Sequence, residues 1–119
     1  MTNRIAIFCQ DQESETSLAQ ILSGREVELV MLNNHVDLIL HLLEHDCQAA
    51  IYGLELPLDM GLKIVQILRK IRPKLPLIVV SDEIKDGIGG KILQEGVSYY
   101  TLRPVSPERL NEVMETVLH

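Results

Sequence analysis

Four consecutive apolar residues, Leu77-Ile78-Val79-Val80, form the clearest strand pattern in the chain. Before them, apolar residues at helical spacing cover 62–71, and Pro73 ends that helix because proline has no backbone N–H to donate. After them, residues 85–95 form a weaker helical pattern, and Gly96 follows as a suitable C-terminal cap. A strand between two helices is the unit from which α/β sheets are built.

The same alternation runs through the rest of the chain. Further β-prone runs cover 5–9, 27–32, 49–52 and 97–102, and helical patterns separate them. The last helix has a strong start at Ser106-Pro107-Glu108, which offers a capping serine, a proline at the first position and an acid in the first turn. Five strands alternating with five helices predict an α/β fold with an open, mostly parallel sheet and helices on both faces.

The composition limits the class of protein. The chain has 119 residues, which suits one domain, and 46% of them are hydrophobic. Its formal net charge of −6 argues against binding nucleic acid through bulk charge. No apolar run approaches the ~20 residues that span a bilayer, and no signal-peptide pattern is visible, so we expect a cytoplasmic protein without membrane contact. Two cysteines without CxxC spacing indicate neither a disulfide framework nor a zinc site.

In open parallel sheets, functional residues follow the carboxyl ends of the strands. Here the third strand is followed by a loop with a proline and a glycine, and the fourth by a serine. The fifth contains a tyrosine and precedes an Arg-Pro pair. These residues are Pro57 and Gly61, Ser81, Tyr100, and Arg103-Pro104. With them, residues 1–119 resemble the receiver domain of bacterial two-component response regulators from end to end.

The resemblance implies a flavodoxin-like (βα)5 three-layer sandwich with a central five-stranded parallel sheet, in the order 2-1-3-4-5. It also implies a cis peptide bond between Arg103 and Pro104. Receivers act in two-component phosphorelays, often in the control of transcription. Residues 1–119 are then either a stand-alone receiver or the N-terminal domain of a longer response regulator, and both alternatives stay open.

The sequence departs from the receiver pattern where phosphoryl chemistry would occur. The acidic pair after the first strand reads Gln10-Asp11, and Gly53 stands in the phosphoacceptor position. Arg103 replaces the lysine of the pattern, and its planar fork is not equivalent to a compact ammonium. Mg²⁺ prefers several hard oxygen ligands, of which Asp11 alone remains. We therefore predict an atypical, degenerate receiver that is independent of phosphorylation, with no catalytic residue, no cofactor and no firm metal site.

Two further acids lie near this pocket in the sequence. Glu55 either leans over Gly53 as a fixed negative charge beside Arg103 or is a solvated loop acid, and the second interpretation is favoured. Asp82 is expected to cap the following helix rather than to bind metal. The degenerate pocket is thus predicted to comprise Gln10, Asp11, Gly53, Glu55, Ser81 and Arg103.

Other patterns favour structural roles. Cys9 follows the first strand, but the next six residues, 10–15, contain no glycine or arginine and three acids, unlike a phosphate-cradling loop. His41 and His45 are spaced for a metal, yet no third ligand is evident, so surface positions are favoured. The glycines of 87–90 lack the context of a phosphate loop; they weaken the fourth helix, by ~1 kcal/mol each relative to alanine.

The function expected from these observations is signal transduction through protein–protein contacts. The partner would be a second copy, a kinase or an output domain, bound through the fourth helix, fifth strand and fifth helix. The candidate contact residues are Lys91, Leu93, Tyr99, Tyr100, Leu102, Arg109 and Glu112.

Two alternatives compete with this expectation. The first is a phosphoaccepting regulator in which Asp11 or Ser81 substitutes for the missing aspartate. The second is a small-molecule-binding module of flavodoxin-like shape, which an aromatic content of 3% disfavours because flavin stacking needs aromatic rings.

Overall fold

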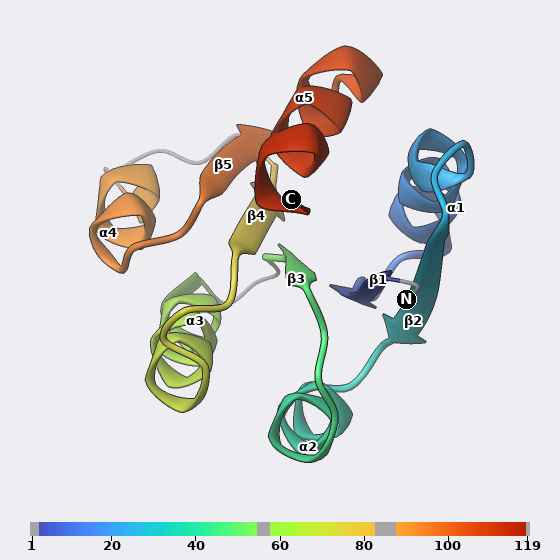
Figure 1. Ribbon diagram of the computed structural model, residues 1–119. Helices are drawn as coiled ribbons and strands as arrows, with labels where there is room; N and C mark the ends of the chain where they lie inside the picture. Colours follow the sequence, from blue (N-terminus) through green and yellow to red (C-terminus); the bar gives the residue numbers. More distant parts are fainter. Residues whose placement is uncertain (1–2, 55–57, 83–87, 119) are drawn as a thin grey trace.

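A computed structural model describes residues 3–54, 58–82 and 88–118, in which five strands and five helices alternate (Figure 1). The strands are β1 (Asn3–Phe8), β2 (Val27–Leu32), β3 (Ala49–Gly53), β4 (Leu77–Ser81) and β5 (Tyr99–Leu102). The helices are α1 (Gln12–Leu22), α2 (His35–Glu44), α3 (Leu58–Ile71), α4 (Ile88–Gln94) and α5 (Pro107–Val117).

The strands form one parallel sheet in the order β2-β1-β3-β4-β5, which confirms the predicted fold. Helices α1 and α5 cover one face, and α2, α3 and α4 cover the other (Figure 1). This division follows from right-handed crossovers, because the chain steps from β1 to β2 in one direction and from β2 onward in the opposite direction. The central strands β3 and β4 are buried along their whole length.

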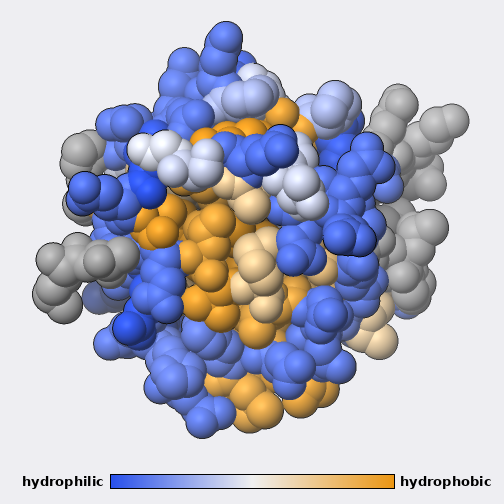
Figure 2. Space-filling view, turned by 90° about the vertical axis from the view of Figure 1, so that its right-hand side faces the viewer, coloured by the Kyte–Doolittle hydropathy of each residue, from blue (hydrophilic) through white to orange (hydrophobic). Residues whose placement is uncertain are grey.

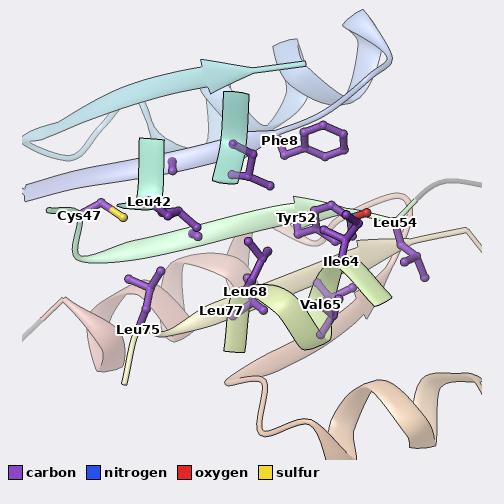
Figure 3. Close-up of a cluster of buried hydrophobic side chains, with 14 of the residues drawn as sticks. Phe8, Leu42, Cys47, Tyr52, Leu54, Ile64, Val65, Leu68, Leu75 and Leu77 are labelled. Atoms are coloured by element: carbon purple, nitrogen blue, oxygen red, sulfur yellow. The ribbon is translucent and has the colours of Figure 1, made fainter. Parts of the chain in front are cut away.

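Alternating side chains of each strand supply two separate cores. Along β1, Ile5 and Ile7 pack under α1 and α5, whereas Ala6 and Phe8 face α2 and α3. Figure 3 shows the second of these cores, in which Tyr52 lies beside Ile64 of α3. The rings of Phe8 and Tyr52 stack with centroids 5.1 Å apart. The two-residue period of a strand thus explains how short apolar runs fill both layers.

The edge strand β2 is less well covered than the central strands. Its residues are half-buried except for Glu28, which is exposed and pairs with Arg4 of β1 at 3.1 Å. Figure 2 shows the side of the molecule where β2 lies, with apolar atoms at its centre and hydrophilic atoms around them. At the bottom of this view, at the height of α2 in Figure 1, further apolar atoms reach the surface.

Local signals in the sequence set the element ends. Ser106 caps α5 and accepts a hydrogen bond from the Arg109 backbone N–H, as predicted from the sequence. Gly96 has φ of 83° just after α4, which confirms its role as a cap. The fifth strand begins at Tyr99, two residues later than the sequence pattern indicates. No helix in the described part of the chain is both long and apolar enough to cross a membrane.

Candidate functional site

The candidate site lies at the carboxyl edge of the sheet, where the ends of four neighbouring strands meet. Gly53 ends β3 and Ser81 ends β4, while Arg103 directly follows β5. The register pairs Phe8 of β1 with Tyr52 of β3, so Cys9 is the β1-side neighbour of Gly53. A cavity of about 400 Å³ opens at this edge and is lined by Asp11, Glu13, Ser14, Ser17, Leu18, Val80, Asp82, Arg103, Pro104 and Val105.

Gly53 is tightly enclosed. A Cβ atom at this position would lie 3.0 Å from the Phe8 carbonyl oxygen, 3.2 Å from Nη2 of Arg103 and 3.7 Å from Sγ of Cys9. The first two separations are shorter than ordinary van der Waals contact, so a side chain would require β1 or Arg103 to move. The guanidinium of Arg103 therefore occupies the direction in which a longer residue at position 53 would extend.

Arg103 connects three parts of the structure across this edge. Its Nε donates a hydrogen bond to Oγ of Ser14 in α1 at 2.9 Å. Its Nη1 lies 3.4 Å from Oδ1 of Asp82, which follows β4. The Arg103 side chain is 18% exposed and that of Asp82 is 81% exposed, so solvent screens this ion pair and little stabilisation is expected from it. The hydrogen bond to Ser14 is the better-shielded contact.

The peptide bond between Arg103 and Pro104 is cis, as the resemblance implies. Arg103 itself lies over Gly53, and α5 begins at Pro107.

Asp11 acts as a helix cap. Its carboxylate accepts a hydrogen bond from the Ser14 backbone N–H at 3.0 Å, at the N-terminus of α1. Partial burial acts to raise the pKa of Asp11, but the hydrogen bonds from Ser14 and the charge of Arg103 outweigh it, so this pKa lies below its usual value. Gln10 is exposed, and Cys9, buried among the β1 core residues, is the residue next to Gly53.

The described residues around Gly53 do not fit a magnesium site. They offer a thiol, a backbone carbonyl and a guanidinium cation, whereas Mg²⁺ requires several oxygen ligands and is repelled by a cation. Glu55 and Pro57, which the sequence also placed at this loop, lie outside the described residues. Throughout residues 3–54, 58–82 and 88–118, no three His, Cys, Asp or Glu side chains come together as metal ligands.

The histidine pair of α2 stands apart from this edge. The rings of His41 and His45 lie 4.9 Å apart, and their exposed neighbour Asp37 completes no metal-binding group in the described part of the chain. Burial, the neighbouring His45 and the positive charge of Arg4 lower the pKa of His41. The arrangement favours the interpretation of these histidines as ordinary helix residues.

A second polar contact lies beside the pocket, between β4 and β5. The hydroxyls of Ser81 and Tyr100 are 2.7 Å apart and form a hydrogen bond, and Ser81 is fully buried. Gly89 of α4 leaves room for the Tyr100 ring, because a Cβ there would come within 2.9 Å of Cε2 of the ring. The sequence pattern identified Ser81 and Tyr100, but neither this role of Gly89 nor the contact of Ser14 with Arg103.

The candidate interaction face divides into exposed and inward-facing residues. Leu93 and Leu102 are 53% and 43% exposed, and together they give α4 and β5 an apolar surface. Lys91 of α4 and the α5 residues Arg109 and Glu112 are exposed and charged. Tyr99 and Tyr100 are half-buried, packing toward the α5 and α4 sides of the sheet respectively.

The comparisons with known proteins agree with this geometry. A family model described as "Response regulator receiver domain" matches residues 5–115. A CheY-like response regulator receiver domain protein from Methanospirillum hungatei is similar in structure, with a TM-score of 0.85, 24% identity, and coverage of 98% of this chain and 93% of that chain. No curated protein sequence matches significantly.

Two further solved structures cover nearly the whole chain. The N-terminal signal receiver domain of a two-component response regulator from Bacteroides fragilis has a TM-score of 0.87 and 16% identity, covering 100% of this chain and 98% of that one. A response regulator from Thermotoga maritima has a TM-score of 0.87 and 13% identity, covering 99% and 98%. Because the family model spans most of the sequence and the fold agrees, the chain belongs to the response regulator receiver domain family.

Proposed function

We propose that this receiver domain transmits signals through protein contacts without being phosphorylated and without catalytic activity. One observation carries the proposal: Gly53 ends β3 with no side chain, and the guanidinium of Arg103 lies over it, 3.2 Å from where a Cβ would be. A glycine cannot form an acyl phosphate. The neighbouring cation would lie where the acceptor and its metal would otherwise be held.

The surroundings of Gly53 support the same proposal. Phosphoryl transfer needs groups that stabilise developing negative charge, usually a metal ion together with a cation. Cys9, buried beside Gly53, offers a thiol rather than an oxygen, and Asp11 already uses one carboxylate oxygen to cap α1, so the two provide few of the oxygen ligands that Mg²⁺ needs. Arg103 is held by Ser14 and Asp82, so in our proposal its positive charge faces the Asp82 carboxylate rather than a phosphoryl group.

We infer that the output surface is formed by α4, β5 and α5. Leu93 and Leu102 supply exposed apolar contact area, and Lys91, Arg109 and Glu112 supply exposed charge on α4 and α5. Apolar residues within a charged rim are typical of protein–protein contact sites. The partner would be a kinase, an output domain or a second copy, in the cytoplasm, and transcriptional control is one pathway in which such a domain would act.

The competing acceptor residues are less well supported. Ser81 is fully buried and its hydroxyl is hydrogen-bonded to Tyr100, so a phosphodonor could reach it only after that contact opened.

A small-molecule site is disfavoured as well, because the cavity at the carboxyl edge is bordered by the charged residues Asp11, Glu13, Asp82 and Arg103 rather than by aromatic rings.

The test is to treat the protein with a small-molecule phosphodonor and Mg²⁺ and to measure intact mass. We expect no phosphoryl adduct. Titration with beryllofluoride and Mg²⁺, followed by NMR, should leave the amides of Asp11, Gly53 and Ser81 unshifted. A typical receiver with an aspartate acceptor, treated in parallel, provides the positive control. A labile adduct, or shifts clustered on these three residues, would contradict the proposal.

A further inference from the structure

The outer surface of α2 carries an apolar stripe that nothing in the described fold covers. Val36, Leu40 and Leu43 are 62%, 46% and 59% exposed. Their spacing of four and three residues places them on one side of the helix, while Leu38 and Leu42 point into the core. The helix is therefore apolar on its buried face and also on its outward side.

Helix α3 carries a matching stripe. Met60 and Ile67 are 49% and 39% exposed, and they are seven residues apart, which is two helical turns. Between and after them stand Lys63 and Lys70, which are also exposed. The series Met60, Lys63, Ile67, Lys70 repeats at alternating intervals of three and four residues, the spacing that helices use for packing along their length.

The two stripes lie next to each other. Helices α2 and α3 are neighbours on the same face of the sheet (Figure 1). Nη1 of Arg72, just after α3, donates hydrogen bonds to the carbonyl oxygens of Leu42 and His45 at 3.0 and 3.4 Å, which brings the C-terminal ends of both helices to the same level. The right-handed sense of each helix turns Leu43 toward α3, and Ile67 toward α2.

We define the α2–α3 surface as Val36, Leu40 and Leu43 together with Met60 and Ile67. From their exposed fractions, these side chains present apolar area on the order of 400 Å², within the range of the largest patches on soluble monomers, which are often functional. The other two exposed large hydrophobic residues of the described chain, Leu93 and Leu102, lie on α4 and β5.

Exposed charges of opposite sign accompany the two apolar stripes. Asp37 and Glu44 lie on α2, beside its apolar stripe, and Lys63 and Lys70 lie on α3, in the same stripe as Met60 and Ile67. Each pair is seven residues apart, so both pairs span about 10 Å along parallel helices. Asp59, one turn before Lys63, belongs to the first turn of α3, where an acid complements the helix dipole.

We propose that the α2–α3 surface binds a second copy of this chain, with α2 of one copy against α3 of the other. A two-fold axis parallel to the helices would place Asp37 opposite Lys63 of the partner subunit, and Glu44 opposite Lys70 of the partner subunit. A two-fold axis across the helices would instead set acids against acids. The surface is therefore complementary to itself in one orientation, which is the property that a symmetric dimer requires.

The charge pattern favours a second copy over an unrelated helix. An unrelated amphipathic helix would need both acidic and basic residues at this spacing. A second copy already carries both, the acids on α2 and the lysines on α3. The apolar area is small for a permanent interface, so the dimer is expected to be weak and concentration-dependent. This inference does not depend on whether another residue accepts a phosphoryl group in place of Gly53, and its test uses different variants.

Sedimentation equilibrium over a concentration series, from about 1 µM to about 500 µM, measures the association. We expect reversible dimerisation, weakened at least about tenfold by Leu40→Ser or Leu43→Ser. These residues are exposed, so the variants should fold, and circular dichroism checks this. Gln20→Ser is the control, because Gln20 is an exposed residue of α1 outside both proposed surfaces, and it should leave the association unchanged. Leu93→Ser tests instead whether the copies meet through the α4–β5–α5 surface.

Charge reversal makes the test sharper. Lys63→Glu with Lys70→Glu makes the chain more negative, and Asp37→Lys with Glu44→Lys makes it less negative, yet both should weaken the dimer. Combining all four substitutions should restore it. A monomer at every concentration would overturn the proposal, as would a dimer that Leu93→Ser disrupts, or a monomer whose α2–α3 amides shift only with an added amphipathic peptide.

Discussion

Two neighbouring contacts at the carboxyl edge of the sheet differ in whether the residues of the receiver pattern are present. At Gly53, the side chain is absent and Arg103 fills the space above it. One strand further along, Ser81 and Tyr100 remain hydrogen-bonded, with Gly89 leaving room for the tyrosine ring. The first contact concerns the chemistry of an acceptor, and the second concerns the packing between β4, β5 and α4. The difference teaches that the packing on the α4 side can persist without a side chain at the acceptor position.

The largest expected effect is that of Gly53→Asp. The new Cβ would meet the Phe8 carbonyl oxygen at 3.0 Å and the Arg103 guanidinium at 3.2 Å, so we expect a loss of about 1–3 kcal/mol in the free energy of unfolding. Urea denaturation measures this loss. Gly24→Ala is the control, because nothing lies within 4 Å of a Cβ at Gly24. We also expect Gly53→Asp not to accept a phosphoryl group; rapid phosphorylation of this variant would show that the acceptor alone was missing.

The next effect concerns the hydroxyl pair. Tyr100→Phe leaves the fully buried Ser81 hydroxyl without its tyrosine partner and should cost about 1–3 kcal/mol of stability. Ser81→Ala should cost about 1 kcal/mol, because the half-buried tyrosine hydroxyl can turn to water. A double-mutant cycle measured by urea denaturation should reveal coupling between the two. Additive effects would mean that the hydrogen bond contributes nothing to stability.

A subtler effect is expected at Gly89. Gly89→Ala should displace the Tyr100 ring, since the added Cβ would lie 2.9 Å from Cε2, and this cost should offset the helix-propensity gain of up to about 1 kcal/mol. Gly90→Ala is the matched control: its Cβ meets nothing within 4 Å, so it should show that gain in full. Aromatic NMR signals of Tyr100 should shift in the first variant only. Equal stabilisation by both substitutions would contradict the packing role of Gly89.

The smallest effect is expected at Asp11. Asn is as good an N-cap as Asp, so Asp11→Asn should change stability at neutral pH by less than about 0.5 kcal/mol. The pKa of Asp11 is lowered in the folded protein, so its charge stabilises the fold above its unfolded pKa, and that contribution disappears as the pH falls through the folded pKa. Asp11→Asn should therefore reduce the loss of stability in acid. Urea midpoints compared at neutral and acidic pH test this.

The sequence was sufficient for the fold because each local signal agreed with the others. The apolar runs at Ile5 and Leu77 alternate with helical patterns, and Ser106 and Gly96 mark helix ends, so strands and helices could be placed before any tertiary contact was known. The strand order required the resemblance, since periodicity alone does not say which strands are neighbours.

The site was only partly predictable. The residue types at Gly53, Ser81 and Arg103 could be identified by position, but the contacts that hold Arg103 depend on how α1 packs against the sheet. Ser14 lies one helical turn before the core residue Leu18, a spacing that could have indicated an inward-facing hydroxyl. Gly89 was interpreted as a source of helix weakness, because no local pattern reveals that a ring 11 residues away packs against it.

The position of Arg103 over Gly53 has a consequence for how this domain can evolve. An aspartate arriving at position 53 would meet the guanidinium already there, and a shorter side chain arriving at position 103 would leave a gap beside a glycine. Each single step back toward the ordinary receiver pattern therefore passes through a less stable intermediate. The two positions should therefore be inherited as a pair, because a change at either one alone is destabilising.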